Sequence, residues 1–283
     1  MKVSIVGFGL IGGSIALNLK SKLQNVEIVG IDPEKKNLDF GVERGFLDVP
    51  RGTIGEEVRG SDFVVIATHL NAYKSVAGEL IGHLEGSELV MDVGSVKGFV
   101  VREVAPIFAE RGLSFVPAHP IAGTEKQGAQ NAVLGLFEGA RCIITPCNNG
   151  EEELRRAEYF WGILGSKVEY LDPFEHDAIF SQVSHIPHLI AYALVDYVVE
   201  EEGGRAVDYA GGGFRDFTRI AASSAEMWST IFELNRDNVI EDLERFMELL
   251  NVYKRAIRKG NWQELKERLE KASRIRANMK FSF

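Results

Sequence analysis

The sequence predicts an α/β fold, with a doubly wound parallel sheet in residues 1–171 and an all-helical domain in residues 172–283. Three observations predict it. The first part of the chain alternates short apolar runs, rich in β-branched residues, with segments of helical periodicity. A glycine-rich turn follows the first of these runs, and after Asp172 and Pro173 apolar residues recur only at helical spacing. Such alternation is typical of parallel strands covered on both faces.

The expected strands, in chain order, are residues 3–6, 26–31, 63–67, 89–92, 115–117, 141–145 and 168–171. Between them, apolar periodicity predicts helices over 11–22, 72–84, 97–111 and 151–164. The second part is expected to be helical over 174–202, 225–258 and 262–277, with a kink at Pro187. The first of these segments has a broad apolar surface, which predicts burial against a second subunit in a homodimer, through Ile186, Leu189, Ile190, Ala193 and Leu194.

Composition limits the classes of partner and compartment. A net charge of −9 argues against nucleic acid and anionic membranes, which need a basic surface, although a few local cations suffice for an anionic small molecule. Cys142 and Cys147 are too few for a disulfide framework, so a reducing compartment is expected. No stretch reads as apolar for long enough to span a bilayer. We therefore expect a cytoplasmic protein with no nucleic-acid or membrane partner.

The glycine-rich turn predicts a dinucleotide site of the Rossmann type. The segment is Gly7-Phe8-Gly9-Leu10-Ile11-Gly12, between an expected strand and helix. Such glycines permit a tight turn, close approach of a pyrophosphate and close packing of the helix, whose amino end attracts phosphate. Asp32 follows Gly12 by 20 residues, the spacing of a carboxylate that binds the ribose hydroxyls and favours NAD over NADP. The neighbouring Lys35 and Lys36 weaken that preference, and an ordinary strand–helix turn is the alternative.

His119 and Ser95 are the candidate catalytic residues. Oxidation of an alcohol needs a group that accepts the hydroxyl proton, and a neutral imidazole suits that task. His119 is expected in a loop just after a strand end, where open α/β sheets place their ligand crevice. Ser95 also follows a strand and is a candidate to orient His119 or bind the reacting hydroxyl. The alternatives are a surface histidine and a helix N-cap serine.

Two further groups lie in the helical part. His185 and His188 fall on one face of an apolar helix, either as site residues or as a satisfied core pair, and no metal-binding pattern accompanies them. Arg215 and Arg219 are four residues apart after a glycine run that includes Gly212. On one helical turn, two guanidinium groups would converge on a dicarboxylate. The alternative is a solvated basic face with Asp216 as a local ion-pair partner.

These motifs occur in the order seen in the prephenate/arogenate dehydrogenase family of tyrosine biosynthesis, which the chain resembles over nearly its whole length. The resemblance rests on the glycine turn, Asp92-Val93-Gly94-Ser95-Val96-Lys97, His119-Pro120-Ile121-Ala122-Gly123-Thr124-Glu125, Ser184-His185-Ile186-Pro187-His188 and residues 211–219. It implies NAD-dependent oxidation and decarboxylation of prephenate to 4-hydroxyphenylpyruvate. It also implies the monofunctional form, because no mutase-like segment precedes the turn and no regulatory domain follows the last helix, so tyrosine would inhibit at the active site.

The resemblance assigns further roles to single residues. Arg219 is the principal carboxylate ligand, aided by Arg215, while His188 lies near the side-chain end of the substrate and Glu125 at the mouth of the pocket. Thr68 lies near the nicotinamide. His69, where relatives commonly have proline, either contacts the cofactor or is exposed, and exposure is the expectation. Three alternatives remain open: an arogenate dehydrogenase giving tyrosine directly, another two-domain hydroxyacid or imino-acid dehydrogenase, and a non-catalytic NAD-sensing protein.

Overall fold

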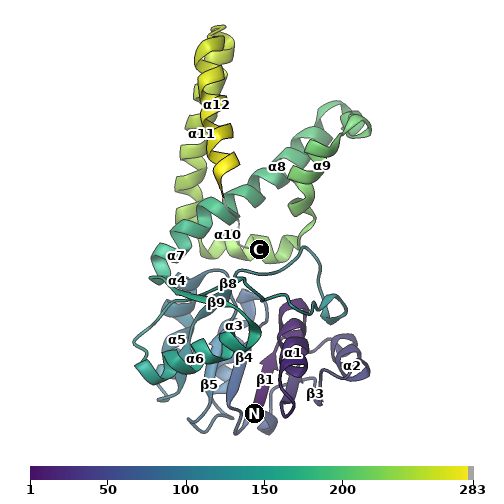
Figure 1. Ribbon diagram of the computed structural model, residues 1–283, viewed down its shortest axis with the longest axis vertical. Coiled ribbons are helices and arrows are strands. Elements are labelled where there is room, and N and C mark those ends of the chain that lie inside the picture. Colours follow the sequence, from purple (N-terminus) through teal and green to yellow (C-terminus); the bar gives the residue numbers. More distant parts are fainter. Residues whose placement is uncertain (280–283) are drawn as a thin grey trace.

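A six-stranded parallel sheet forms the centre of the first domain. The computed structural model describes residues 1–279 (Figure 1). The strands run in the order β3-β2-β1-β4-β5-β6, and every neighbouring pair is parallel. This order confirms the predicted doubly wound sheet, and the chain reverses its direction of travel between β1 and β4, where such folds bind ligands. The strands are β1 (Lys2–Val6), β2 (Glu27–Ile31), β3 (Val49–Arg51), β4 (Phe63–Ile66), β5 (Leu89–Asp92) and β6 (Ser114–Val116).

Helices cover both faces of this sheet and enclose two apolar clusters. On one face, Ile15 and Leu19 pack with Phe160 and Trp161, and on the other Tyr73 packs with buried residues of the next helices. The strand residues between them are buried on both sides, as the continuous apolar runs predicted. The helices are α1 (Leu10–Lys22), α2 (Lys35–Glu43), α3 (Tyr73–Leu80), α4 (Lys97–Phe99), α5 (Ala105–Ala109) and α6 (Glu151–Leu164).

Several elements differ from the prediction. The helix expected over 97–111 is divided into α4, a π-helical turn at Val100–Val104 and α5. Pro106 explains the division, because it has no N–H to continue the ladder of hydrogen bonds. The helix α2 and the strand β3 were not predicted.

A second, three-stranded sheet lies beside the first. It consists of β7 (Ala118–Pro120), β8 (Arg141–Ile144) and β9 (Lys167–Tyr170), with β7 antiparallel to β8 and β8 parallel to β9. The sequence predicted β8 and β9 but not β7. His119 was expected in a loop, and this was wrong: it is the middle residue of β7, paired with Ile143. Its backbone is therefore fixed by a strand ladder.

The second domain is helical and extends away from the sheet (Figure 1). Pro187 lies within the continuous helical segment Pro173–Glu200, just after the π-helical turn Ser181–His185, so the hydrogen-bonding pattern of the helix changes beside it. The helix predicted over 225–258 is divided at Asn235. The elements are α7 (Pro173–Phe180), a π-helical turn (Ser181–His185), α8 (Ile186–Glu200), a 3-10 helix (Glu201–Tyr209), α9 (Gly212–Thr218), a 3-10 turn (Arg219–Ala222), α10 (Ala225–Leu234), α11 (Arg236–Arg258) and α12 (Trp262–Asn278).

The two domains share a core. Trp228 and Ile231 of α10 are 5% and 3% exposed and belong to the apolar cluster that contains Val64 of β4 and Val90 of β5. Helix α10 contacts the 3-10 turn Leu70–Ala72, which follows β4, so the helical domain packs directly on the sheet domain at the carboxyl ends of its strands (Figure 1).

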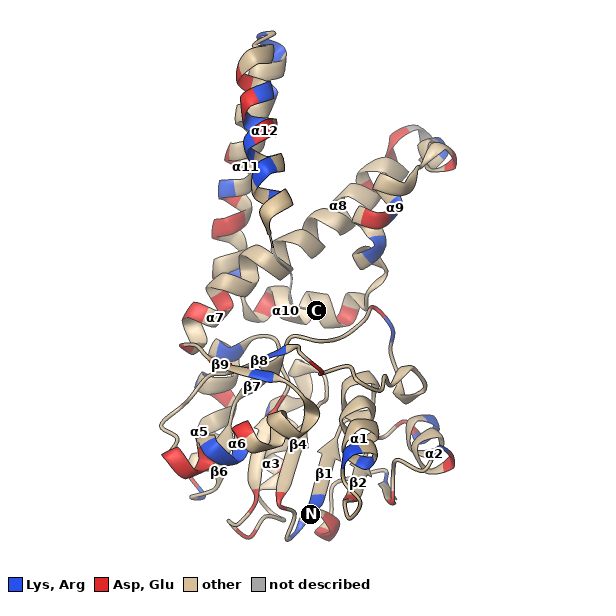
Figure 2. Cartoon of the chain, viewed as in Figure 1, with Lys and Arg blue, Asp and Glu red and all other residues tan. Residues whose placement is uncertain are grey.

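The long helical segment Pro173–Glu200 leaves much apolar surface uncovered. It spans 28 residues with a mean hydropathy of 1.3, so by length and composition alone it is apolar enough to cross a membrane. The expectation that no stretch passes this criterion was wrong. Figure 2 shows few charges on α8, whereas α11 and α12 carry both signs. An uncovered apolar helix face is equally typical of a subunit interface.

Candidate functional site

The glycine turn has the shape of a phosphate cradle. A Cβ on Gly7, whose φ is +95°, would lie 2.5 Å from the carbonyl carbon of Ala67, and one on Gly12 would lie 2.1 Å from the oxygen of Gly7. Packing therefore requires both glycines. A Cβ on Gly9 would meet nothing within 4 Å, so the space above this residue is open. No side chain caps the amino end of α1, which leaves its first N–H groups available to an anion.

Asp32 fixes this turn from the end of β2. Its Oδ2 accepts a hydrogen bond from the N–H of Phe8 at 2.7 Å, and its Oδ1 accepts one from Glu34 at 2.8 Å. The side chain of Phe8 is fully buried, and that of Leu10 is nearly so. These two predicted cofactor residues therefore present only their main chain to the turn. Ile11 is half-buried at the start of α1.

The residues around the glycine turn bear on the choice between NAD and NADP. Lys35 pairs with Asp39 at 2.9 Å and Lys36 with Glu34 at 3.1 Å, so an acidic partner already faces each of these cations. Thr68 is half-buried beyond β4, and its N–H borders Gly7. His69 is exposed, as expected.

His119 is held by two residues of the helical domain. Its Nδ1 lies 2.8 Å from Nε2 of His176, and Nδ1 of His176 lies 2.9 Å from Oδ1 of Asp177. The ring of His119 also packs against Phe180, with centroids 5.0 Å apart. Nε2 of His119 makes no hydrogen bond to any other described residue. One ring nitrogen is thus anchored and the other is free.

Burial keeps this group of histidines neutral. Desolvation lowers the pKa of His119 well below its usual value, and the neighbouring His176 and Lys97 lower it further. Burial also lowers the pKa of His176, and that of His185 to about 4. Near neutral pH, His119 therefore has a lone pair with which to accept a proton.

A buried ion pair positions the residue before His119. Nζ of Lys97 lies 2.6 Å from Oδ2 of Asp92, and both side chains are inaccessible to solvent. The same Nζ donates to the carbonyl oxygen of Ala118 at 2.6 Å, while Oδ1 of Asp92 accepts from the N–H of Ala118 at 3.1 Å. Both main-chain polar groups of Ala118 are thereby fixed to β5 and α4.

Ser95 is half-buried in the bend between β5 and α4. It does not cap α4, because the N-cap residue is Val96. The free N–H groups of Lys97 and Gly98 instead donate to the two oxygens of Asp177, each at 2.7 Å. The N-cap alternative for Ser95 is therefore wrong, and Asp177 of the other domain caps α4.

His188 and His185 both contact Trp228. The ring of His188 stacks on it with centroids 3.7 Å apart, and its Nδ1 donates to the carbonyl oxygen of Ser184 at 2.8 Å. His185 meets the edge of Trp228, and its Nδ1 lies 3.0 Å from Nδ2 of Asn235. His185 is thus a satisfied core histidine, whereas His188 is only half-buried.

Arg219 reaches the segment that follows His119. Its Nη1 lies 2.9 Å from Oε2 of Glu125, and a Cβ on Gly123 of the same segment would lie 3.9 Å from Ile11. The segment therefore passes close to Ile11 in the first turn of α1, and this ion pair joins it to the helical domain. Arg215 does not converge with Arg219: its side chain is 81% exposed and pairs with Asp216, the local partner named as the alternative. Gly212 is exposed at the start of α9.

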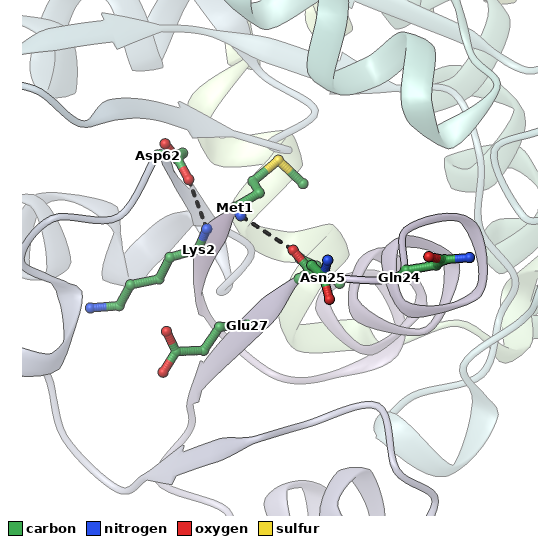
Figure 3. Close-up of a pocket in the computed structure, with 7 residues that line it drawn as sticks. Met1, Lys2, Gln24, Asn25, Glu27 and Asp62 are labelled. Atoms are coloured by element: carbon green, nitrogen blue, oxygen red, sulfur yellow. Dashed lines mark hydrogen bonds between the residues drawn. The ribbon is translucent and has the colours of Figure 1, made fainter.

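We also searched the described residues for a metal-binding group and for a second pocket. Among residues 1–279, no group of three or more His, Cys, Asp or Glu side chains could hold a metal ion. A pocket at the amino ends of β1 and β2, at the edge of the sheet opposite Gly7, is polar and open (Figure 3). It is lined by Met1, Lys2, Gln24, Asn25, Val26, Glu27 and Asp62.

Comparison with known proteins identifies the family. The family described as prephenate dehydrogenase, nucleotide-binding domain, matches residues 15–170, and the prephenate dehydrogenase dimerization domain matches residues 172–271. The chain belongs to the prephenate dehydrogenase family. The prephenate dehydrogenase of Lactococcus lactis is 32% identical over 283 residues, which cover 98% of this chain and 77% of that protein.

Solved structures of the prephenate dehydrogenase family share the whole fold. That of Aquifex aeolicus, in complex with hydroxyphenyl propionate and NAD+, has a TM-score of 0.92 at 35% identity, covering 99% of this chain and 98% of that one. The arogenate dehydrogenase of Synechocystis has a TM-score of 0.81 at 26% identity, covering 98% and 99%. The resemblance inferred from the motifs is confirmed, and the chain is an enzyme of this family.

Four residues of this prephenate dehydrogenase family member escaped the sequence reasoning. His176 and Asp177 stand 57 or more residues from His119, and no local pattern marks them. Asp92 and Lys97 lie in a segment that was singled out for Ser95. Their spacing could have indicated the buried ion pair, because Lys97 follows Asp92 by five residues at a strand end, in a segment otherwise apolar enough to be buried.

Proposed function

We propose that this chain catalyses the NAD-dependent oxidative decarboxylation of prephenate to 4-hydroxyphenylpyruvate. The observation that carries the proposal is His119, a neutral imidazole anchored at Nδ1 and free at Nε2, on a strand whose continuation passes close to Ile11 in the first turn of α1. Family membership supports the same reaction. The Aquifex structure, which contains NAD+ and a hydroxyphenyl acid, supports the same pair of ligands here.

The dinucleotide fits the glycine turn. The open space above Gly9 would receive the pyrophosphate, with Gly7, Phe8, Leu10, Ile11 and Gly12 contributing main chain, Asp32 facing the ribose and Thr68 lying towards the nicotinamide. When bound there, NAD would supply the acceptor for the hydride that leaves the ring carbon bearing the hydroxyl. The buried carboxylate of Asp32 and the paired Lys35 and Lys36 support NAD over NADP.

His119 moves the proton. As the ring carbon is oxidised, Nε2 of His119 accepts the hydroxyl proton, with Ser95 positioning the hydroxyl. Loss of CO2 from the ring makes the product aromatic, and the phenolic oxygen regains the proton from Nε2. Proton transfer is therefore balanced, and His119 returns to its neutral state.

Arg219 binds a substrate carboxylate. Its partner Glu125 lies at the entrance, so an incoming carboxylate competes with Glu125 for the guanidinium. His188 faces the side-chain end of the substrate, and Gly212 and Arg215 lie at the outer edge. Tyrosine, which resembles the product, would inhibit by occupying this same site.

The proposed assembly is a homodimer in the cytoplasm. Residues 1–171 bind the cofactor, while residues 172–283 complete the substrate site and form the dimer. The half-covered surface of Leu189, Ile190 and Leu194 and the match to a dimerization domain support this division.

The test is NADH formation from NAD with prephenate and, in parallel, with arogenate, with identification of the aromatic product. We expect 4-hydroxyphenylpyruvate from prephenate. His119→Asn should abolish turnover and keep NAD affinity. Tyrosine formed from arogenate alone would reassign the substrate to the amino analogue, and no turnover of either would overturn the proposal.

A further inference from the structure

The hydrogen-bond chain behind His119 has a direction. Both oxygens of Asp177 accept main-chain N–H groups, from Lys97 and Gly98 at 2.7 Å, so this carboxylate acts as an acceptor. Nδ1 of His176, 2.9 Å from Oδ1, must then carry the hydrogen that it donates. Because burial keeps His176 neutral, its Nε2 has a lone pair. That lone pair faces Nδ1 of His119 at 2.8 Å, which must be the donor.

We propose that His176 and Asp177 are positioning residues that hold His119 in the tautomer with hydrogen on Nδ1 and a lone pair on Nε2. This inference rests on the proposed function of His119 as the proton acceptor. Free imidazole in water prefers the opposite tautomer, with hydrogen on Nε2, which could not accept the hydroxyl proton. The helical domain therefore selects the tautomer in which Nε2 of His119 can act as a base.

The arrangement also links the two domains at one carboxylate. Asp177 caps the amino end of α4 in the sheet domain while it orients His176 of α7. The main-chain oxygen of Asp177 accepts from Nδ2 of Asn235 at 2.8 Å, which also fixes it to the junction between α10 and α11. The tautomer of His119 thus depends on correct docking of the helical domain on α4.

A purely structural role for His176 predicts a different outcome from tautomer control. His176 is fully buried and stacks on Phe180 with centroids 4.3 Å apart. His176→Phe keeps an aromatic ring in that stack but has no acceptor for Nδ1 of His119. His176→Gln loses the ring but offers an amide oxygen near the former Nε2. If His176 acts only through packing, His176→Phe should be the more active variant. If it controls the tautomer of His119, His176→Gln should be the more active variant.

The first measurement reads the tautomer directly. Nitrogen-15 spectra of the full-length protein labelled at histidine should show His119 protonated at Nδ1 and unprotonated at Nε2, assigned by comparison with His119→Asn. In His176→Phe we expect the hydrogen to move to Nε2, and in His176→Gln to remain on Nδ1. A hydrogen on Nε2 in the unaltered protein, or an unchanged tautomer in His176→Phe, would overturn the inference.

The second measurement is turnover. His176→Phe should lower kcat on the order of 100-fold, as loss of a correctly held general base does, with KM for both substrates changed by less than about threefold. His176→Gln should recover most of this loss. His83→Phe is the matched control, because Nδ1 of His83 also pairs with a carboxylate, Glu56 at 3.0 Å, far from the site. It should leave kcat unchanged.

These measurements separate the two claims. If the unaltered enzyme oxidises neither substrate, the proposed function fails while the tautomer assignment is still decided by the spectra. If it oxidises prephenate and His176→Phe, shown by thermal melting to be folded, is equally fast, the positioning role fails and the proposed function stands.

Discussion

Replacing Lys97 by methionine removes the cation that pairs with the buried carboxylate of Asp92 beside the catalytic strand. Methionine keeps a flexible stem of similar length, so packing changes little. Asp92 then retains neutral neighbours, namely the N–H groups of Gly94, at 2.8 Å, and Ala118, at 3.1 Å, and the buried hydroxyl of Tyr73. The carbonyl oxygen of Ala118 loses its donor at 2.6 Å. An uncompensated carboxylate would thus remain in a site inaccessible to solvent.

The expected loss of unfolding free energy in Lys97→Met is large. Breaking a buried ion pair by removing one partner costs about 3–5 kcal/mol of unfolding free energy. At roughly 2–4 °C per kcal/mol for a chain of this size, Tm should fall by about 6–20 °C. Because Ala118 precedes His119, molecules that remain folded should also show a lower kcat. Urea denaturation and a thermal scan measure the first two quantities, and NADH formation the third.

Lys74→Met is the matched control. Lys74 pairs with Glu103 at 2.8 Å, nearly the same separation, but both side chains are about half exposed. Solvent screening limits such a pair to about 1 kcal/mol or less. If Lys97→Met and Lys74→Met lowered the unfolding free energy equally, the buried pair would not organise this site and the reasoning would be refuted.

Three further predictions concern the glycine turn, acid stability and the arginines. Gly9→Ala, whose methyl meets no protein atom, should change unfolding free energy by less than about 1 kcal/mol yet weaken NAD binding at least about tenfold in a fluorescence titration. Gly12→Ala should cost more than about 2 kcal/mol, because its methyl overlaps the oxygen of Gly7; equal stability of the two variants would refute the assignment. Since burial lowers the pKa of His185 to about 4, the unfolded chain binds a proton that the folded chain does not, so stability falls on acidification below about pH 6.5. Between pH 7 and 5, protonation of His185 should lower the unfolding free energy by about 2 kcal/mol. Urea titrations at both pH values should show this part of the loss in the unaltered protein and not in His185→Gln. Equal losses of unfolding free energy in the two proteins would contradict the prediction. Arg219→Met should raise KM for prephenate more than about tenfold and Arg215→Met less than about twofold, and steady-state kinetics showing equal effects would place both guanidinium groups in the pocket.

The sequence was sufficient where the physical cause is local. The central strands β4 and β5 follow from uninterrupted apolar runs, and the glycine turn follows from a spacing that sterics impose on Gly7 and Gly12. Apolar periodicity likewise predicted α1 and α6 to within a residue.

The sequence was insufficient where the cause is a long-range contact. The strand β7 has three residues, one of them a proline, and it exists because Asp92, Lys97 and β8 hold it. His176 acts on His119 across 57 residues, and Arg215 differs from Arg219 only through the partner that each meets. A cap on the helix after β5 from the nearby Ser95 was one of the alternatives, yet the cap on α4 comes from Asp177, 80 residues from Lys97.

The insertion of α10 into the apolar cluster of the sheet domain has a consequence for how such chains can be recombined. Trp228 and Ile231 complete a core that includes residues of β4, β5 and α3 and Leu70 of the turn after β4. A chimera joined near residue 171 would pair the α10 of one parent with the sheet domain of another, and it would expose or overfill that core. Exchange of helical domains between relatives should therefore succeed only when the facing residues of the sheet travel with them.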